Sequence, residues 1–578
     1  MATTVADVMV ATLKQSGVSR IYGIPGDSLN GFTDALRRDG EITWEHVRHE
    51  EAAAFAAEAD ARVSGKPGIV LVTAGPGGTN AITGIASAYV DSIPMIVIAG
   101  QVTTATLKTE NERQIGLNEL DGTRLVTSIT KFAETIMNAK DVARTLDVAL
   151  RRATSGRPGP VWIEVPLDVQ NAEMEANSRI AFVKSQDEPE DNEIEACVAL
   201  LRKAERPVLI VGNGARGAPL FWLLDRLRIP AVSSWNGSDL LRSEMYIGRM
   251  GIFGDRASNY AVQHADLIFA IGTRFTVAQI GHHLRLFAPD AKKIVVDIDR
   301  SELNKSAVKP DIAVCCDATA FCEAIISTHL QIERIKWVTL LWRMRDSYPT
   351  MLPEYRTETQ GVNAYHFVEQ LNRRMADDAI VVTDVGIAYI CTMQTLKLNG
   401  RQRLFHSGGV SAMGYGLPAS IGAYRAGGGE QTICLAGDGG MMLNLQELQT
   451  IAHHNLPIKI FVFANNGYAT IRMAQDNHFG RHSISSPETG LSCPDFAEIG
   501  KAFGIPVWSM FDNAEAEQWM EHVLSRQHPM LCVVHISPNQ KIAPRVQSKM
   551  KDGKFVPVAL DDMWPPLEEV VSREGVGS

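Results

Sequence analysis

Short apolar runs recur along this sequence and alternate with longer amphipathic stretches. Each run is bounded by Gly, Pro or Asp, which is the pattern of strands that are buried on both faces of a sheet. Because such strands need helices on both sides, the alternation predicts an α/β fold with parallel sheets. The clearest runs are residues 68–73, 95–99, 161–165, 208–211, 267–271 and 294–298.

Two stretches interrupt the alternation and read as linkers between domains. The first, residues 172–193, is polar, and the second, residues 345–361, contains two prolines. A chain of 578 residues is also too long for one hydrophobic core and suggests about three domains. We therefore expect three doubly wound parallel-sheet domains, followed by a tail rich in Lys, Asp and Pro. Their expected limits are residues 1–175, 190–340 and 358–540, with the tail at 541–578.

Composition and charge exclude several classes of protein. The net charge of −10 is small for this length, and no run of Lys and Arg is long enough to follow a nucleic-acid backbone. No apolar run approaches the ~20 residues of a membrane helix, and residues 1–17 read as a first helix rather than an export signal. The eight cysteines include no Cys-x-x-Cys pair. We expect a cytoplasmic protein without a nucleic-acid partner or stable membrane insertion.

Polar residues follow two strand-like runs in the last predicted domain. The run 432–436 leads into Gly-Asp-Gly-Gly, and the run 458–463 is followed by Asn465. Mg²⁺ prefers oxygen ligands, and here the carboxylate of Asp438, the amide oxygen of Asn465 and the carbonyl of Gly467 can supply them. The glycines and the following helix N-terminus suit a diphosphate. A simple tight turn is the alternative, but the second strand with its Asn favours a metal and diphosphate site.

This pattern resembles the signature of thiamine-diphosphate enzymes, in which Gly-Asp-Gly is followed by a pair of Asn residues. The first Asn of that pair is Ala464 here, and the metal ligand corresponds to Asn465. The resemblance implies thiamine diphosphate and Mg²⁺ as cofactors, with the pyrimidine-binding domain first in the chain and the diphosphate-binding domain last. The residues that it implies around the diphosphate are Val385, Gly386, Gly437, Gly439 and Gly440.

A carboxylate beside the pyrimidine ring is needed to activate this cofactor, because it favours the tautomer that removes the proton from the thiazolium carbon. From the residues alone, Glu50 and Glu51 would be acids at a helix N-terminus. The resemblance of Arg-His-Glu and its Ala-rich continuation to the family pattern implies that Glu50 is the activating residue. It also implies Met413 as the apolar wedge between the rings, with the Ser411 carbonyl facing the amino group. A lone Met is otherwise usually a core residue.

In this family the pyrimidine-binding segment of one chain meets the diphosphate-binding segment of another. The resemblance therefore implies a homodimer or homotetramer with active sites between subunits.

The middle domain carries a weaker signal. The run 208–211 enters a Gly turn, and such turns are usually structural. The segment 248–281 and the Asp residues after it resemble the flavin-binding domain of acetolactate synthase and pyruvate oxidase, so FAD is a further expected cofactor. Cys316 stands where the family has Gly, which would crowd the flavin. The implied FAD contacts are Gly251, Gly254, Thr273, Arg274, Asp297, Asp317 and, from the first domain, Arg157.

The resemblance covers nearly the whole chain but points to two reactions. Residues 21–61 look most like pyruvate oxidase and quinone-dependent pyruvate dehydrogenase, and the chain from residue 68 onward looks like acetolactate synthase. Three positions depart from the biosynthetic acetolactate synthases. Their Phe-Gln pair is Leu117-Asn118, their second Arg after the Gly-x-Arg-Phe turn is Ala278, and their Trp beyond the metal Asn is Ala474.

We expect decarboxylation of a 2-keto acid, pyruvate, and carboligation of the hydroxyethyl carbanion to a second carbonyl, with Glu50 and Asn118 as catalytic residues. Loss of the Arg at Ala278 removes the side chain best suited to a carboxylate and leaves the acceptor open. The alternatives are an FAD-linked pyruvate oxidase or quinone-dependent dehydrogenase, two-carbon transfer to a keto-sugar, and a catalytically silent regulatory paralogue. The Pro-broken tail, without an amphipathic face for a membrane, argues against the quinone-linked alternative.

Overall fold

The computed structural model describes residues 3–174, 187–305, 308–399, 401–551 and 554–567. These residues form two compact units, and each is described by itself. One unit is built from Met1–Ser185, Arg373–Tyr389 and Gly400–Pro538, and the other from Gln186–Asn372, Ile390–Asn399 and Asn539–Ser578. Among the described helices, none combines the length and the apolar character that crossing a bilayer requires.

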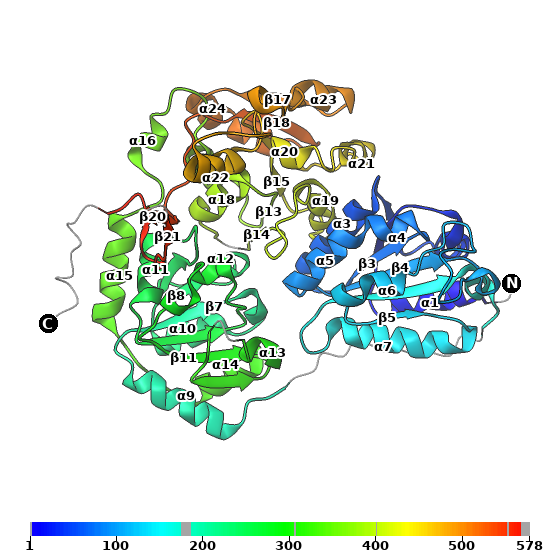
Figure 1. The fold of residues 1–578 in the computed structure, drawn as a ribbon, viewed down its shortest axis with the longest axis horizontal. Helices are drawn as coiled ribbons and strands as arrows, with labels where there is room; N and C mark the ends of the chain where they lie inside the picture. The colour runs from blue at the N-terminus through cyan, green and yellow to red at the C-terminus, as the bar shows by residue number, and fades with distance from the viewer. Residues whose placement is uncertain (1–2, 175–186, 306–307, 400, 552–553, 568–578) are drawn as a thin grey trace. The chain divides into compact units, whose positions relative to one another are not determined.

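The first unit begins with a parallel six-stranded sheet of order β2-β1-β3-β4-β6-β5. Helices α1, α2 and α7 pack on one face, and α3 and α5 pack on the other (Figure 1). The strands are β1 (Arg20–Gly23), β2 (Thr43–His46), β3 (Gly68–Val72), β4 (Met95–Gln101), β5 (Ala133–Thr135) and β6 (Pro160–Pro166). The helices are α1 (Val5–Gln15), α2 (Asn30–Asp39), α3 (Glu50–Ser64), α4 (Pro76–Asn80), α5 (Ile82–Asp91), α6 (Gly122–Val126), α7 (Val142–Thr154) and α8 (Leu167–Asn171).

A second parallel sheet of the same unit has the order β14-β13-β15-β16-β18-β17. Its strands are β13 (Ile380–Thr383), β14 (Arg403–Phe405), β15 (Thr432–Gly437), β16 (Lys459–Ala464), β17 (Val507–Met510) and β18 (Met530–His535). Its helices are α19 (Gly416–Ala426), α20 (Asp438–Met441), α21 (Glu447–His453), α22 (Ala469–Phe479), α23 (Phe496–Ala502) and α24 (Asn513–Leu524). Helices α17 (Ala364–Arg374) and α18 (Ile387–Thr395) lie on either side of β13 in the sequence, and their residues up to Asn372 and from Ile390 belong to the other unit.

Helices α3 and α19 join the two sheets of this unit. Their contact is close because a Cβ on Gly422 would lie 1.9 Å from the carbonyl oxygen of Ala56. Phe55 meets Tyr415 edge-on, with ring centroids 5.2 Å apart, in a shared hydrophobic cluster. The helix that begins at Glu50 is therefore packed against the diphosphate-type sheet of its own chain.

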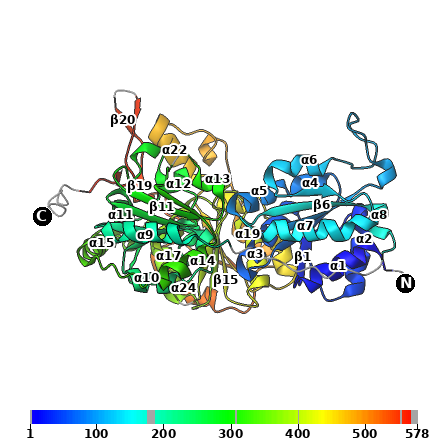
Figure 2. The ribbon, with the colours of Figure 1, turned by 90° about the horizontal axis from the view of Figure 1, so that it is seen from below.

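The other unit holds the central parallel sheet, drawn in green (Figures 1 and 2). Its strand order is β12-β11-β10-β7-β8-β9. Helices α9, α10 and α14 cover one face, and α11 and α15 cover the other. The strands are β7 (Pro207–Val211), β8 (Ala231–Ser233), β9 (Tyr246–Arg249), β10 (Leu267–Ile271), β11 (Lys292–Asp297) and β12 (Ile312–Cys315). The helices are α9 (Asp191–Lys203), α10 (Leu220–Leu227), α11 (Arg256–Gln263), α12 (Val277–Ile280), α13 (Arg300–Leu303), α14 (Ala318–Ser327), α15 (Ile335–Ser347) and α16 (Pro353–Arg356).

The three parallel sheets confirm the predicted α/β fold class. The predicted linkers are partly helical, since α9 begins at Asp191, α15 runs to Ser347 and α16 lies within 345–361. Residues 175–186 of the first linker lie outside the described part of the chain. The limits of the three domains stay a prediction.

The described residues of the tail after residue 541, 542–551 and 554–567, belong to the central unit. Strand β19 (Arg545–Val546) pairs with β22 (Met563–Trp564), and β20 (Lys549–Lys551) pairs with β21 (Lys554–Val556), both antiparallel. Leu560 joins the hydrophobic cluster beneath α11 and α15. The tail is thus part of the central core.

Candidate functional site

Asp438 is the first residue of α20, directly after β15, and its carboxylate binds the loop after β16. Its Oδ2 accepts hydrogen bonds from the backbone N–H of Asn465 at 2.9 Å and of Gly467 at 3.1 Å. Its Oδ1 accepts one from the N–H of Gly439 at 2.9 Å. Because β15 and β16 are neighbours in a parallel sheet, their ends meet as the sequence predicts. The three residues proposed as metal ligands are therefore brought together.

The donor set of this loop fits a Mg²⁺ ion bridging to a diphosphate. Burial raises the pKa of Asp438, although the three backbone N–H groups oppose that shift, and a bound divalent cation would favour the charged carboxylate. The amide of Asn465 and the carbonyl of Gly467 add two oxygens of the kind that Mg²⁺ prefers. Gly386 has a positive φ of 80°, and a Cβ on it would meet no atom within 4 Å, so there is open space beside the loop.

Arg472 on α22 holds the Asn465 loop in place. Its guanidinium donates to the carbonyl oxygens of Asn465 at 2.9 Å, Asn466 at 3.1 Å and Ser485 at 2.8 Å. Arg472 was not predicted from the sequence, because its only signal there is a cation seven residues after the predicted ligand.

Asp384 is a second buried acid at the same edge of the sheet. It follows β13 and accepts backbone N–H groups from Val385 at 2.9 Å, Gly414 at 3.3 Å and Gly416 at 2.9 Å. A Cβ on Gly440 would lie 2.2 Å from its Oδ1. Burial raises the pKa of Asp384 to about 6. Its carboxyl group therefore fixes the loops that carry Val385, Met413 and Gly440, and it was missed because nothing local in the sequence reports these partners.

Met413 reaches the Asp438 loop. Its Cε lies 3.2 Å from the position that a Cβ on Gly439 would occupy. Ser411, two residues earlier, has a left-handed backbone with φ of 54°, which fixes the direction of the peptide between them. Met413 thus lies beside the Asp438 loop, and its role as the wedge between the cofactor rings stays a prediction.

Glu50 begins α3 and is buried. Its Oε2 accepts a hydrogen bond from Nδ2 of Asn80 at 2.9 Å, and its Oε1 faces the Gly77 turn. The segment before it is held by the diphosphate-type half of the same unit, because Glu447 accepts the backbone N–H of Arg48 at 2.8 Å. The Glu447 side chain is buried, which raises its pKa to about 7. Neither Asn80 nor Glu447 was predicted.

Residues 441–454 do not form one continuous helix, because α20 ends at Met441 and α21 begins at Glu447. Between them, Nδ2 of Asn444 donates to the carbonyl of Gly414 at 2.8 Å and to Glu51 at 3.2 Å. These long-range bonds compete with a continuous helix, and they tie the Met413 loop to the start of α3.

Asn118 lies on an exposed loop with a left-handed φ of 60°. Its carbonyl oxygen approaches Gly75 so closely that a Cβ there would lie 2.3 Å away. Buried Glu119 organises the loop by accepting the N–H groups of Ile115 at 2.8 Å and Gly116 at 2.9 Å. Burial raises the pKa of Glu119, but these backbone bonds outweigh it and hold the pKa below its usual value. Leu117 is 81% exposed.

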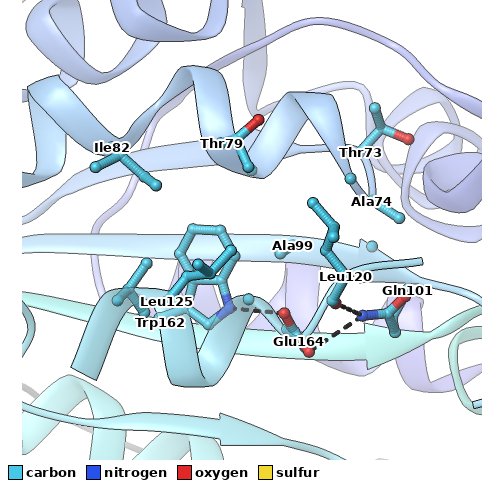
Figure 3. A pocket seen from close by; sticks show the side chains of 15 residues that line it. Thr73, Ala74, Thr79, Ile82, Ala99, Gln101, Leu120, Leu125, Trp162 and Glu164 are labelled. Carbon is cyan, nitrogen blue, oxygen red and sulfur yellow. Dashed lines mark hydrogen bonds between the residues drawn. The ribbon is translucent and has the colours of Figure 1, made fainter. Parts of the chain in front are cut away.

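A small pocket lies beneath this loop, between α4 and the sheet (Figure 3). Buried Glu164 faces it and accepts hydrogen bonds from Thr135 at 2.9 Å, Trp162 at 3.2 Å and Gln101 at 3.3 Å. Gln101 also donates to the carbonyl of Leu120 at 2.8 Å, which links the pocket to the Asn118 loop. Burial raises the pKa of Glu164.

The predicted flavin contacts of the central unit gather at the carboxyl edge of its sheet. The strand order reverses between β7 and β10, where open α/β sheets bind ligands. Thr273 follows β10, Asp297 ends β11, and Asp317 caps α14 through Oδ1 after β12. The Thr273 side chain is 4% exposed, and its hydroxyl has no hydrogen-bond partner among the described residues. Such a group costs about 1–3 kcal/mol unless a ligand satisfies it, so this edge fits a nucleotide.

The other predicted flavin residues lie in loops of the central unit, except Arg157. Gly251 has a φ of 130° and lies against the carbonyl of Ala278, and Gly254 turns back so that its N–H donates to Gly251. The carbonyl of Arg274 accepts a hydrogen bond from Lys305 at 3.2 Å. Arg157 belongs to the other unit, where its Nε donates to Ser92 at 2.8 Å.

Cys316 does not project from the edge of the central sheet. Its side chain is buried in the cluster formed by α9 and α14, with Cys197 and Cys322. The expected crowding of a flavin by this residue therefore has no support in its packing.

At three positions Ala stands where the family has a larger residue, and the backbone there stays regularly hydrogen-bonded or helical. The carbonyl of Ala464 accepts the N–H of Ile536 at 3.0 Å, and that of Ala278 accepts the N–H of Ile252 at 2.9 Å. Ala474 is exposed on α22, where a larger side chain would be solvent-accessible.

Comparison with known proteins gives matches along most of the chain. Family models described as the N-terminal, central and C-terminal domains of thiamine pyrophosphate enzymes match residues 3–124, 194–325 and 384–535. The chain is 32% identical to the acetolactate synthase isozyme 1 large subunit of Escherichia coli (strain K12), covering 94% of this chain and 96% of the relative. It is 31% identical to a probable acetolactate synthase large subunit of Methanocaldococcus jannaschii, over 93% and 92%, and to the chloroplastic acetolactate synthase of Arabidopsis thaliana, over 94% and 83%.

Proposed function

Because the chain belongs to the thiamine pyrophosphate enzymes that include the acetolactate synthase large subunits, we propose that it decarboxylates pyruvate and joins the two-carbon unit to a second carbonyl compound. The observation that carries this proposal is the loop in which Asp438 binds the backbone of Asn465 and Gly467. We assign Mg²⁺ to the oxygens of these three residues and the diphosphate to the adjacent glycines.

Thiamine diphosphate, when bound, supplies an acidic thiazolium carbon that adds to a 2-keto acid and stabilises the charge left when CO₂ departs. The protein must place a carboxylate at the pyrimidine ring nitrogen, and Glu50 is our candidate. Because Asn80 donates to Oε2 of Glu50, we assign Oε1 as the atom that would share a proton with the pyrimidine ring nitrogen. Burial of Glu50 excludes water from that contact.

On the substrate side, we propose Asn118 as the amide that orients the reacting carbonyl. Its loop is anchored by Glu119, and the neighbouring Leu117 side chain projects into solvent. Ala278 and Ala474 are smaller than their family counterparts, which favours an acceptor range that extends beyond a second 2-keto acid.

We further propose that the enzyme is at least a homodimer with active sites between subunits, as the family resemblance implies. Large apolar side chains are exposed around the Asn118 loop and around the Asp438 loop, and such surfaces commonly mark interfaces. They are Ile115, Leu117, Leu120 and Leu125 on the first, and Met442, Leu443, Ile471, Phe479 and Ile484 on the second. Analytical ultracentrifugation should show a dimer or tetramer, and a monomer at micromolar concentration would contradict this assignment.

FAD is our proposed second cofactor, bound at the carboxyl edge of the central sheet. The buried Thr273 hydroxyl, which lacks a partner among the described residues, supports this assignment. We retain Gly251, Gly254, Arg274, Asp297 and Asp317 as proposed contacts. The eight cysteines, all free thiols, suit the reducing cytoplasm that we propose as the protein's location.

The reaction is tested by incubating the full-length protein with pyruvate, thiamine diphosphate and Mg²⁺. We expect CO₂ release and acetolactate, measured as acetoin after acidification. Reduction of an artificial electron acceptor without acetolactate would instead indicate an oxidase. CO₂ release and product only when a keto-sugar is added would indicate two-carbon transfer to that sugar. No CO₂ from any 2-keto acid would indicate a silent paralogue.

A further inference from the structure

The C-terminal tail is bound to the loop that carries Gly251 and Gly254. The backbone N–H of Val546 in β19 donates to the carbonyl of Ile252 at 2.7 Å. Strand β19 is in turn paired with β22, so the end of the tail is held against the same loop. This loop is the one to which we assign part of the flavin site.

Asn259 on α11 binds the loop and the tail with one side chain. Its Nδ2 donates to the carbonyl of Gly251 at 2.9 Å and to the carbonyl of Leu560 at 3.0 Å. Its Oδ1 accepts the N–H of Gly251 at 2.9 Å, and the sulfur of Met563 lies 3.4 Å from Nδ2. The side chain is fully buried. Asn259 thus fixes both the N–H and the carbonyl of Gly251, which has a positive φ. The same side chain also donates to a carbonyl of the tail.

Further contacts hold the tail in the same position. The ring Nε2 of His264 lies 2.8 Å from Oδ2 of Asp561. The guanidinium of Arg545 stacks over the Trp564 ring at 4.3 Å and donates to the carbonyl of Ile542 at 2.7 Å. Leu560 is buried in the core of the central unit. The tail is therefore held at several points besides its hydrogen bond to Asn259.

We propose that strand β19 and the segment from Leu560 to Trp564 form a strap that holds the Gly251–Gly254 loop in its flavin-binding shape, with Asn259 as the positioning residue. This proposal rests on the proposed flavin site. Gly251 has a backbone conformation that few residues adopt, so the loop depends on bonds from outside itself. Since the same contacts order the loop and the tail, FAD binding and tail docking must strengthen each other to the same extent.

The test uses full-length protein and two variants that break the strap from opposite sides. Asn259→Leu removes the bridging amide, and the double variant Asp561→Asn/Met563→Ala changes only the tail and guards against misfolding of the first. Asp562→Asn is the matched control, because its ion pair with Lys549 is exposed and lies within the tail. Hydrogen exchange of residues 248–255 and 542–564 is measured without and with FAD. The FAD dissociation constant is measured by fluorescence quenching.

We expect faster exchange of both segments in the two strap variants, FAD-dependent protection of the tail in the wild type, and FAD binding weakened by roughly tenfold. The control should match the wild type. If the tail variant exchanges faster in the tail but binds FAD as the wild type does, the strap is wrong and the flavin site stands. If the wild type itself binds no FAD, the flavin assignment fails and the strap fails with it. Unchanged exchange of residues 248–255 in both variants also overturns the strap.

Discussion

Two sheet edges differ in how many of their buried polar groups find partners within the protein. The first is the carboxyl edge that carries Asp438 and Asp384, and the second is the carboxyl edge of the central sheet, which carries Thr273. At the first, Asp438 and Asp384 each accept three backbone N–H groups from their own unit. At the second, the Thr273 hydroxyl and Nε of Arg249 are buried without a partner among the described residues. The contrast is not absolute, since the Thr383 hydroxyl beside Asp384 is also unpartnered in the described structure.

The two edges are therefore prepared for ligands by different means. The protein's own hydrogen bonds shape the Asp438 loop before any cofactor arrives, which lowers the ordering cost of binding. The central edge leaves hydrogen-bonding capacity for a ligand and depends on the distant tail for its loop geometry.

Glu50→Gln should give the largest effect, a fall in turnover of about 10²–10⁴-fold, because an amide cannot exchange a proton with the pyrimidine ring. The affinity for thiamine diphosphate and the thermal unfolding temperature should stay near the wild-type values. Steady-state kinetics and calorimetric titration measure these quantities. Glu51→Gln, one residue along α3, is the control, and equal loss in both variants would remove Glu50 from its assigned role.

Asp384→Leu should lower the free energy of unfolding by about 3 kcal/mol, because the N–H groups of Val385, Gly414 and Gly416 lose their acceptor. Thiamine diphosphate should bind much more weakly, while FAD affinity stays unchanged. Urea denaturation and titration of each cofactor check the result. Asp378→Asn, in an exposed ion pair with Arg401, should be neutral. Normal thiamine diphosphate binding by the Leu variant would contradict pre-organisation by Asp384.

Glu447→Gln should raise the free energy of unfolding relative to the wild type, and the gain should depend on pH. The folded pKa of Glu447 is about 7 and its ordinary value is 4.5. The folded state therefore keeps a proton that the unfolded state has released, so wild-type stability falls as pH rises from 4.5 to 7. The variant's advantage should grow across that window, to roughly 3 kcal/mol, and then level off. Urea denaturation at several pH values measures it, and a constant difference would contradict the buried acid.

Thr273→Val should give the smallest effect and the opposite sign to Asp384→Leu. Without FAD, removing an unsatisfied hydroxyl should be neutral or stabilise the protein by up to about 1 kcal/mol. With FAD, the variant should bind more weakly by several-fold, about as expected for one lost hydrogen bond. Thermal unfolding with and without FAD measures both. Clear destabilisation of the protein without FAD would show that the hydroxyl has a partner within the fold.

Much of the architecture follows from local sequence. The run 267–271 is β10 as predicted, because a five-residue apolar run between polar residues has few alternatives. The approach of Asp438 to Asn465 also follows, since both come directly after adjacent parallel strands. These features need only periodicity and the geometry of a sheet.

Other features depend on contacts that no local pattern reports. Asn259 and Leu560 are 301 positions apart, and nothing in either segment indicates their hydrogen bond. The break between α20 and α21 occurs because Asn444 binds residues of two other segments. Asp384 and Arg472 were missed for the same reason, since an acid after a strand or a cation on a helix has many ordinary explanations.

Magnesium-dependent binding of thiamine diphosphate tests the central claim most directly. Calorimetric titration of the wild type should show binding that strengthens by more than tenfold when Mg²⁺ is added, about 1.4 kcal/mol or more. Asp438→Asn should keep the fold and lose this dependence on Mg²⁺. Equal affinity of the wild type with and without Mg²⁺, or wild-type behaviour of the variant, would contradict the metal and diphosphate site between Asp438 and Asn465.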